Sequence, residues 1–310
     1  MTSRTETSNN KSRYSWAVRV DVVLDSRGGF KDYAGGSVSL LWQEEGLVLR
    51  LERRNIAPWL ESAGATGYRL TAEATETACE AEALGCRITA AILSVALKKH
   101  WGLTLSWPDS PLPCRVVDRT VSRGITAHGF GTVTSHVDFE ELTREFDAAF
   151  ASYAVVEPRL LLSLELCAAS RCESSSRSRL VMLVSAVEAV AEQRDLGDEV
   201  AALVKELVSC VEGASVSDDA VKRSITGQVQ HLQRESARRA MLRLFISLGF
   251  KNEERELVEE AYSARSKIVH EGARVPGLDG LVIEVDRLVV EMHSRAAQQA
   301  LAADVAARRR

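Results

Sequence analysis

The chain has 310 residues, of which 45% are hydrophobic and 26% are charged, a composition typical of a globular protein and not of a disordered or fibrous one. This length allows two domains, or one large domain, with a substantial core. The formal net charge of −4 excludes a protein that coats nucleic acid through bulk positive charge, so any contact with RNA must come from a local basic patch.

The N-terminal segment, residues 1–13, is rich in Ser, Thr and Asn and has no apolar run, so it predicts a disordered tail and not a signal peptide. No stretch of the chain approaches the ~18 consecutive apolar residues of a membrane span. The six cysteines form neither a CxxC pair nor a Cys/His cluster with zinc spacing, and we expect them to be buried free thiols. These features predict a cytoplasmic protein with no membrane contact, no metal and no cofactor.

The first half of the chain predicts an α+β domain over residues 14–153. Short runs rich in Val, Leu and Trp are separated by turns that contain Gly and Ser, and a long helical pattern follows them. Pro108, Pro111 and Pro113 break this pattern, and the stretch from there through a turn at Gly129–Gly131 predicts loop and short strand. The expected strands are Trp16–Leu24, Val38–Trp42, Leu47–Leu51 and Gly67–Thr71, and the expected helices are Thr75–His100 and Phe139–Ser152.

From residue 157 to residue 305 the pattern is helical throughout, and a basic tail follows at residues 306–310. Short breaks between the helices predict an antiparallel bundle. Gly272 stands where a helix C-cap glycine belongs, and Pro276 follows it as a stop signal. The predicted fold class is therefore α+β, with a mixed strand and helix domain before an all-α domain. The expected helices of the second domain are Arg159–Ala169, Arg177–Gln193, Asp198–Val211, Asp218–Leu248, Glu253–His270 and Asp279–Arg308.

The expected helix Glu253–His270 carries a cation on its apolar side. At about 100° per residue, one sector is apolar and comprises Leu257, Val258, Ala261, Tyr262, Ala264, Ile268 and Val269. Arg265 projects from the middle of this sector, so its guanidinium must be paired or must line a cavity, because an unpaired buried charge is costly. His270 lies about 140° further round in the last turn, where the helix dipole and Glu271 favour its protonated form. By pattern alone, the two residues also fit an internal salt bridge and a favourable C-terminal cation.

The segment Tyr262–Gly272 (YSARSKIVHEG) resembles the R-x4-6-H motif of HEPN domains (higher eukaryotes and prokaryotes nucleotide-binding), and it is most similar to the Apea-like branch. The apolar helix Leu180–Val190, with its embedded glutamate, is similar to an earlier helix of that family. Gln233–Ser236 is similar to part of the helix that precedes the motif. The resemblance covers about residues 157–305. Many active members have Asn, Asp or His directly after the motif arginine, whereas this chain has Ser266.

The resemblance implies an all-α HEPN-type bundle that acts as a metal-independent endoribonuclease, with Arg265 and His270 as catalytic residues. It also implies a homodimer through the C-terminal helical domain, and a toxin-like or anti-phage action on tRNA or other cellular RNA. The N-terminal domain would then be a sensor or regulator that binds a ligand or a protein. The alternative is a non-catalytic HEPN module for dimerisation or for binding a ligand or partner, with Arg265 as a structural ion pair.

Other residues are candidates for supporting roles in this site. Tyr262 and Ser266 belong to the motif itself. Glu188 either pairs with Arg265 and positions the reacting groups, or belongs to a solvated polar stripe on its own helix. The candidates for binding RNA phosphates, with ordinary surface charge as the alternative, are Arg234, Arg238, Arg239 and Lys267.

Overall fold

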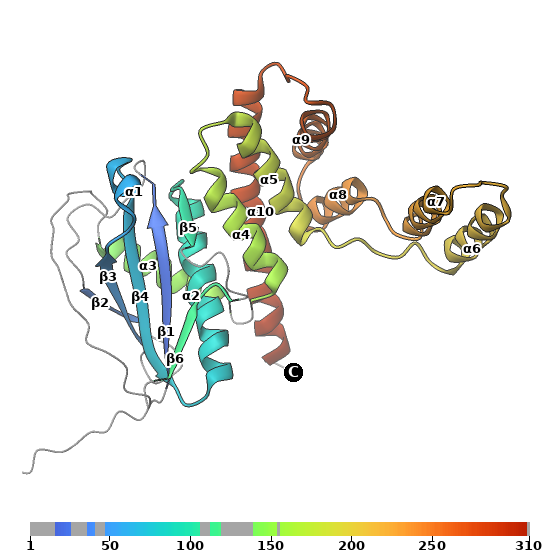
Figure 1. Ribbon diagram of the computed structural model, residues 1–310. Helices are drawn as coiled ribbons and strands as arrows, with labels where there is room; N and C mark the ends of the chain where they lie inside the picture. The colour runs from blue at the N-terminus through green and yellow to red at the C-terminus, as the bar shows by residue number, and fades with distance from the viewer. Residues whose placement is uncertain are drawn as a thin grey trace, which may run out of the picture.

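The computed structural model describes residues 16–25, 36–40, 47–105, 112–118, 139–153 and 156–308. The predicted tail at residues 1–13, the turn at Gly129–Gly131 and the last two residues of the basic tail lie outside the described residues. The described part is an α+β protein, in which an antiparallel sheet with its packed helices precedes a mostly helical region (Figure 1). Within it, no helix is both long enough and apolar enough to cross a membrane.

The sheet is built around its first strand, β1, which pairs with β4 along one edge and with β5 and β6 along the other. All of these pairings are antiparallel. The side chains of Val18, Val20, Val22 and Leu24 alternate onto one face and are fully buried there. The strands are β1 (Trp16–Leu24), β2 (Gly36–Leu40), β3 (Leu47–Arg54), β4 (Thr66–Thr75), β5 (Leu103–Leu105) and β6 (Arg115–Asp118), with the short helix α1 (Pro58–Ser62) between β3 and β4.

The strand predictions hold in position, and those after the first strand differ in length. The prediction for β1 is confirmed at both ends. The described part of β2 begins two residues before Val38, and Trp42 lies outside the described residues. Strands β3 and β4 both run beyond the apolar runs that predicted them. Strand β3 continues because Glu52–Arg54 pair with Gly67–Arg69, and β4 continues to Thr75 because its last residues pair with the start of β1. Backbone pairing, and not apolarity, therefore sets these ends.

The long helix of the first half, α2 (Ala78–Lys98), lies between the sheet and the later helices. It begins after Thr77, whose hydroxyl accepts a hydrogen bond from the backbone N–H of Glu80 at 3.2 Å, while the Glu80 carboxylate accepts one from the N–H of Thr77. This reciprocal capping box explains why the helix begins three residues later than the predicted Thr75.

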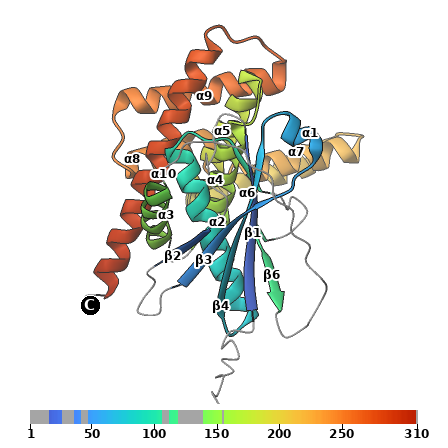
Figure 2. The same ribbon diagram turned by 90° about the vertical axis from the view of Figure 1, so that its left-hand side faces the viewer.

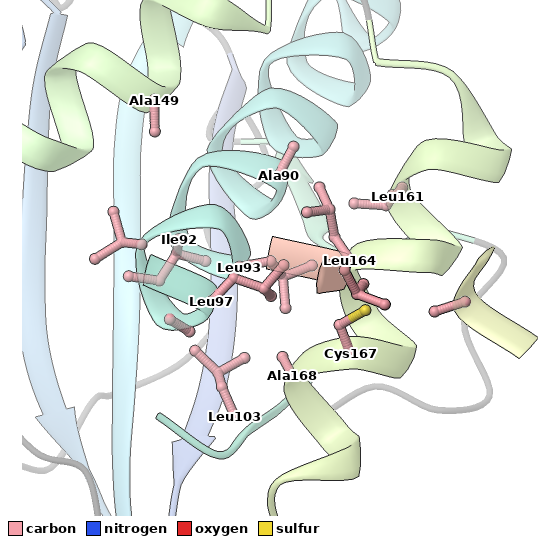
Figure 3. Packing of buried hydrophobic residues seen from close by; sticks show 14 of the residues in the cluster. Ala90, Ile92, Leu93, Leu97, Leu103, Ala149, Leu161, Leu164, Cys167 and Ala168 are labelled. Carbon is pink, nitrogen blue, oxygen red and sulfur yellow. The ribbon is translucent and has the colours of Figure 1, made fainter. Parts of the chain in front are cut away.

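From Ile88 to Leu97, helix α2 is buried on all sides, whereas the sequence predicted one apolar face. Every residue from Ile88 to Leu97 is buried, including two polar ones. The reason is that α3 (Phe139–Ser152) and α4 (Pro158–Ser170) pack against α2 in addition to the sheet. Figure 3 shows Leu93 and Leu97 of α2 on the side of Leu164 and Cys167 of α4. One hydrophobic core therefore extends from the sheet into the later helices, across the predicted boundary at residues 153–157.

Helices α3 and α10 lie on the same side of the sheet as α2, as the view in Figure 2 shows. The prediction for α3 is confirmed at both ends. The predictions for α4, α6, α9 and α10 are confirmed to within two residues at each end. Apart from α4, the helices that follow α2 are α3 (Phe139–Ser152), α5 (Ser176–Val190), α6 (Asp198–Gly213), α7 (Asp219–His231), α8 (Ala237–Ser247), α9 (Asn252–Glu271) and α10 (Leu278–Arg308).

The predicted helix Asp218–Leu248 is wrong as a single element, because the chain forms α7 and α8 with a break between them. In the break, the backbone N–H of Glu235 donates to the carbonyl of Arg194, and the N–H of Leu196 donates to the carbonyl of Gln233. These bonds also explain why α5 ends at Val190 and not at the predicted Gln193, since the segment after α5 pairs with the segment before α8.

Helices α6 and α7 form a hairpin that projects from the rest of the protein (Figure 1). We call this hairpin, residues 196–233, the α6–α7 arm. Val204 is buried in α6, and no residue of α7 is buried. The antiparallel bundle predicted for the whole helical region therefore does not include the arm, whose two helices pack mainly against each other.

The cysteines are free, but the expectation that they are all buried is wrong. Cys114 and Cys167 are buried, and Cys86 is half-buried. The other three, which are Cys79, Cys172 and Cys210, are exposed. Burial of a cysteine depends on which neighbouring elements cover its helix, and this is not visible in local sequence.

Candidate active site

The candidate site is built on α9. Local sequence signals determine where this helix begins and where it ends. Glu253 and Glu254 lie in the first turn, where carboxylates are favoured by the helix dipole, and the Glu254 carboxylate accepts from the N–H of Lys251 at 2.8 Å. Gly272 ends the helix in the left-handed region with a φ of 63°, which confirms the C-cap prediction.

One side of α9 packs against the core of the helical region, where it contacts α5, α8 and α10. Val258, Ala261 and Ala264 are buried there. Val269, which was predicted to belong to the same apolar sector, is instead 49% exposed. It lies at the edge of the sector in the last turn, so helical periodicity alone could not show that no neighbouring element covers it in the described part of the chain.

Arg265 lies at the boundary between the packed side of α9 and solvent, with 23% of its side chain exposed. Its Nη2 donates to Oε2 of Glu188 on α5 at 3.4 Å, and the Glu188 side chain is also 23% exposed. This confirms that the guanidinium is paired, and it identifies Glu188 as the partner. The Nε of Arg265 is buried, and it has no hydrogen-bond partner among the residues that the structure describes.

Arg171 shows how differently a purely structural arginine is held. It is only 5% exposed, and its guanidinium donates to Oδ1 of Asp286 from both Nε and Nη2, at 3.1 and 2.9 Å. Its Nη1 also donates to the carbonyls of Ala96 and Leu97, at 2.9 and 3.0 Å. Arg171 therefore has its donors committed at short distances, whereas Arg265 has one long contact.

His270 lies in the last turn of α9 and is exposed to solvent. It follows Arg265 by five residues, which corresponds to a rise of about 7.5 Å and a rotation of about 140° along a straight helix. The two side chains therefore leave α9 in different directions. Within one chain, an imidazole at position 270 and a guanidinium at position 265 do not converge on the same point.

Arg177, on α5, is a residue of this region that the sequence pattern did not identify. Its Nη2 donates to the carbonyls of Gly272 and Ala273, at 2.9 and 2.5 Å, and so binds the chain directly after the motif. A signal was present in the sequence, because a cation in the first turn of a helix is disfavoured by the helix dipole and needs a partner elsewhere.

The other motif residues differ in their exposure to solvent. Tyr262 is half-buried and packs against the hydrophobic core, and Ser266 is half-buried. Lys267 is exposed, and its backbone carbonyl accepts hydrogen bonds from the C-cap residues Gly272 and Ala273. Of these three side chains, the structure gives only Lys267 free access to solvent.

The three arginines that were candidates for phosphate contacts are bound to carboxylates. Arg234 lies 3.5 Å from Asp195 at the base of the α6–α7 arm. Arg239 lies 3.7 Å from the buried carboxylate of Glu235. Arg238 donates from Nε and Nη2 to one oxygen of Glu259 on α9, at 3.0 and 2.8 Å. Their side chains remain more than half exposed, so each is a surface ion pair and not a free cation.

His293 on α10 is the buried histidine of the helical region. Burial lowers its pKa to about 4, so its ring is neutral at pH 7. The Ser163 hydroxyl donates to the carbonyl of Ala186 at 2.6 Å, so it can accept from Nε2 of His293 at 3.1 Å. His293 is therefore a buried, neutral histidine, whereas His231 on the arm is exposed.

A cavity of about 160 Å³ lies elsewhere, between α2, α3 and α10. Its polar lining includes Ser94, Lys98, Ser152, Tyr153, His293 and Gln298. Both halves of the chain contribute to this lining. The described residues contain no group of three or more His, Cys, Asp or Glu side chains with the geometry of a metal site.

Comparisons of this chain with models of protein families, with curated proteins and with solved structures gave no match.

Proposed function

We propose that this protein is an endoribonuclease of the HEPN type, in which Arg265 and His270 of α9 act on an RNA phosphodiester without a metal ion. The observation that carries the proposal is the state of Arg265. It is a partly covered guanidinium with one long contact to Glu188 and a buried Nε that has no partner in the described part of the chain. It lies five residues before an exposed histidine.

In the proposed reaction, the ribose 2′-oxygen attacks the adjacent phosphorus and the bond from phosphorus to the 5′-oxygen breaks. A base takes the proton of the 2′-hydroxyl, and an acid gives a proton to the leaving 5′-oxygen. The products are a 2′,3′-cyclic phosphate and a 5′-hydroxyl. Histidine titrates near neutral pH and suits either proton transfer, so we assign both to copies of His270.

Arg265 is assigned to the phosphate itself. Negative charge gathers on the non-bridging oxygens in the transition state, and a guanidinium offers a permanently charged pair of parallel donors for them. Its contact to Glu188 is long enough to be exchanged for a phosphate oxygen, unlike the short bonds of Arg171. Glu188 then holds the guanidinium in place between turnovers, and Arg177 fixes the end of the helix that carries His270.

A second copy of the chain is part of this proposal. The divergent directions of Arg265 and His270 are reconciled if a two-fold axis brings the motif of another subunit to the same phosphate. The last two helices carry apolar residues that are exposed in the single chain and suit such a contact, since Val269 of α9 is 49% exposed and Ile283 of α10 is 66% exposed. We place the action on tRNA or other cellular RNA, as a toxin or a defence nuclease, with the sheet-containing half as the regulatory part.

The second candidate function is a non-catalytic HEPN module that dimerises or binds a partner. The ion pair between Arg265 and Glu188 favours this candidate, because it gives the arginine a structural role that needs no substrate. The two candidates differ in whether the purified protein cuts RNA.

The purified chain is expected to cleave total RNA in the presence of a chelator and to leave 2′,3′-cyclic phosphate ends. His270→Ala should lose at least about 100-fold in rate, because general acid–base groups contribute 10²- to 10⁴-fold. His231→Ala is the matched control, since His231 is also an exposed histidine in the last turn of a helix. Gel analysis of end-labelled RNA measures both. Equal rates for the two variants, or activity that requires added magnesium, would reject the mechanism.

Mixing subunits tests the composite site. If each phosphate needs His270 from both copies, a threefold excess of His270→Ala protein should reduce the wild-type activity to about a quarter after subunits exchange at random. If each subunit acts alone, the activity per wild-type chain stays unchanged. The rate of RNA cleavage before and after incubation of the mixture distinguishes the two outcomes.

A further inference from the structure

The α6–α7 arm has an exposed apolar face that is formed by both of its helices. Five of its side chains, which are Leu203, Leu207, Val221, Ile225 and Leu232, are between 37% and 55% exposed, and Cys210 is exposed as well. The spacing on each helix is three, four or seven residues, so each set forms a stripe along its helix.

The two stripes lie on the same face of the hairpin. On α6, the residues that face α7 are centred on the buried Val204, and the stripe is rotated from them by about 90°. On α7, the half-buried Thr226 and Val229 face α6, and the stripe is again rotated by about 90° in the same sense along the sequence. Because the helices are antiparallel, equal rotations bring both stripes to one side.

The opposite face of the arm is polar, which supports this assignment. A groove of about 330 Å³ lies there, and none of the apolar residues of the stripes lines it. Its lining is Glu212, Asp219, Lys222, Arg223, Thr226, Gly227 and Gln230. The arm is therefore a two-faced hairpin, with charged groups on one side and aliphatic groups on the other.

The base of the arm fixes its direction away from the rest of the protein. Backbone hydrogen bonds join the two segments that lead into it, from Leu196 N–H to Gln233 C=O at 2.9 Å and from Glu235 N–H to Arg194 C=O at 2.8 Å. The buried Glu235 carboxylate accepts from Arg243 on α8 at 3.0 Å, which anchors this junction to the body. These contacts keep the arm extended, with its apolar face uncovered in the described part of the chain.

We propose that this face is a self-association surface, which pairs with the α6–α7 arm of a second copy of the chain to form a four-helix bundle. A nucleic acid does not fit the face. By helical position, its outer edge on α6 carries Glu199 and Glu206. Of the arm's cations, Lys222 and Arg223 line the polar groove, and Lys205 also points away from the apolar face. A partner must therefore offer an aliphatic surface and hydrogen-bond donors for two carboxylates.

A second arm supplies both features. The outer edge of the face on α7 carries Ser224, Gln228 and His231, which are all hydrogen-bond donors. A two-fold axis parallel to the helices places α6 of one copy on α7 of the other, so the glutamates of one edge meet these donors. The alternative axis, perpendicular to the helices, would place the glutamates of the two copies against each other, and repulsion disfavours it.

The size of the face indicates a weak contact. A helix of 13 residues is about 20 Å long and two adjacent helices are about 20 Å wide, so each arm offers about 400 Å². Two such faces are at the low end of specific protein interfaces. This contact is independent of RNA cleavage and of the α9–α10 contact. If both contacts form, two different two-fold interfaces lead to tetramers or longer assemblies.

Sedimentation velocity of the full chain, from about 1 to about 100 µM, tests the proposal. Leu203→Glu with Ile225→Glu introduces carboxylates at the centre of the face, and should weaken association at the arm by at least about 30-fold, because two copies of each apolar contact are lost. Ser209→Glu adds the same group at an exposed site on α6 outside the face and should leave the masses unchanged.

The pattern of masses separates this proposal from the composite nuclease site. If both contacts exist, the double variant stops at a dimer that still cleaves RNA. If only the arm contact exists, the wild type forms a dimer and the double variant is a monomer. Identical mass distributions for the wild type and the double variant at all concentrations would overturn the arm contact, whatever the oligomeric state.

Two further measurements test how the two arms are arranged in the proposed contact. A thiol cross-linker should join two chains through Cys210, and Cys210→Ser should abolish this product while the other exposed cysteines remain. Glu206→Lys should weaken association, and adding Ser224→Glu should restore it, because the new charges meet only if α6 lies on α7 of the partner subunit. A slowly reacting Cys210 in a monomeric protein would mean that another segment of the same chain covers the face, and would refute the proposal.

Discussion

Replacing Arg265 with Ala is expected to reduce RNA cleavage by at least about 100-fold, which is the effect of removing one preorganised donor from a developing oxyanion. The free energy of unfolding should fall by only about 1 kcal/mol, because the ion pair with Glu188 is long and partly solvated. Arg265→Lys should keep the charge without restoring activity, since an ammonium group lacks the planar pair of donors. Initial rates on a defined RNA, together with thermal melts, measure the two effects separately.

Two control variants locate the effect at Arg265. Arg238→Ala removes another arginine that is paired with a glutamate, and should change the cleavage rate by less than twofold, because its donors already bind Glu259. Glu188→Gln keeps the shape of the partner but removes its charge, and should lower activity less than Arg265→Ala does if Glu188 only positions the guanidinium. A fully active Arg265→Lys protein would show that a positive charge alone is sufficient and would contradict the assigned role.

Replacing Arg171 with Met is expected to cause the largest loss of stability, about 3–5 kcal/mol, because it leaves the Asp286 carboxylate in a buried site without its main partner. The same change removes the hydrogen bonds to the carbonyls of Ala96 and Leu97 at the end of α2. Arg171 thereby connects α4, α2 and α10, so its loss should affect both halves of the chain together. Thermal unfolding should shift downward by about 10 °C or more.

The double variant Arg171→Met with Asp286→Leu is the control for this interpretation. It removes the stranded charge, so it should recover part of the lost stability. Arg238→Met, at a largely exposed ion pair, should shift the unfolding temperature by no more than a few degrees. If the unfolding temperature of Arg171→Met lies within about 2 °C of the wild-type value, the contacts of Arg171 with α2 and α10 do not hold the two halves of the chain together.

Local sequence determined the elements whose signals are themselves local. Strand β1 and helices α3 and α9 follow from alternation, periodicity and capping residues, and Gly272 ends α9 where a left-handed residue is needed. The same periodicity predicted that Arg265 lies in the middle of the apolar sector of α9 and requires a partner; the structure places it at the edge of the packed side, paired with Glu188. These inferences succeed because they depend on residues within one or two helical turns of each other.

Only the tertiary structure decided which side chains and segments contact each other. Glu188 lies 77 residues before Arg265, and Arg177 lies 95 residues before Gly272, so no local pattern connects them. The burial of the second half of α2 on all sides depends on α3 and α4, and the break between α7 and α8 depends on pairing with the segment after α5. Periodicity shows which side of an element is apolar. That side stabilises the fold only where another element covers it and removes its side chains from water. For this reason the sequence determined the position of the arginine and histidine, whereas the tertiary structure determined how each of them is held.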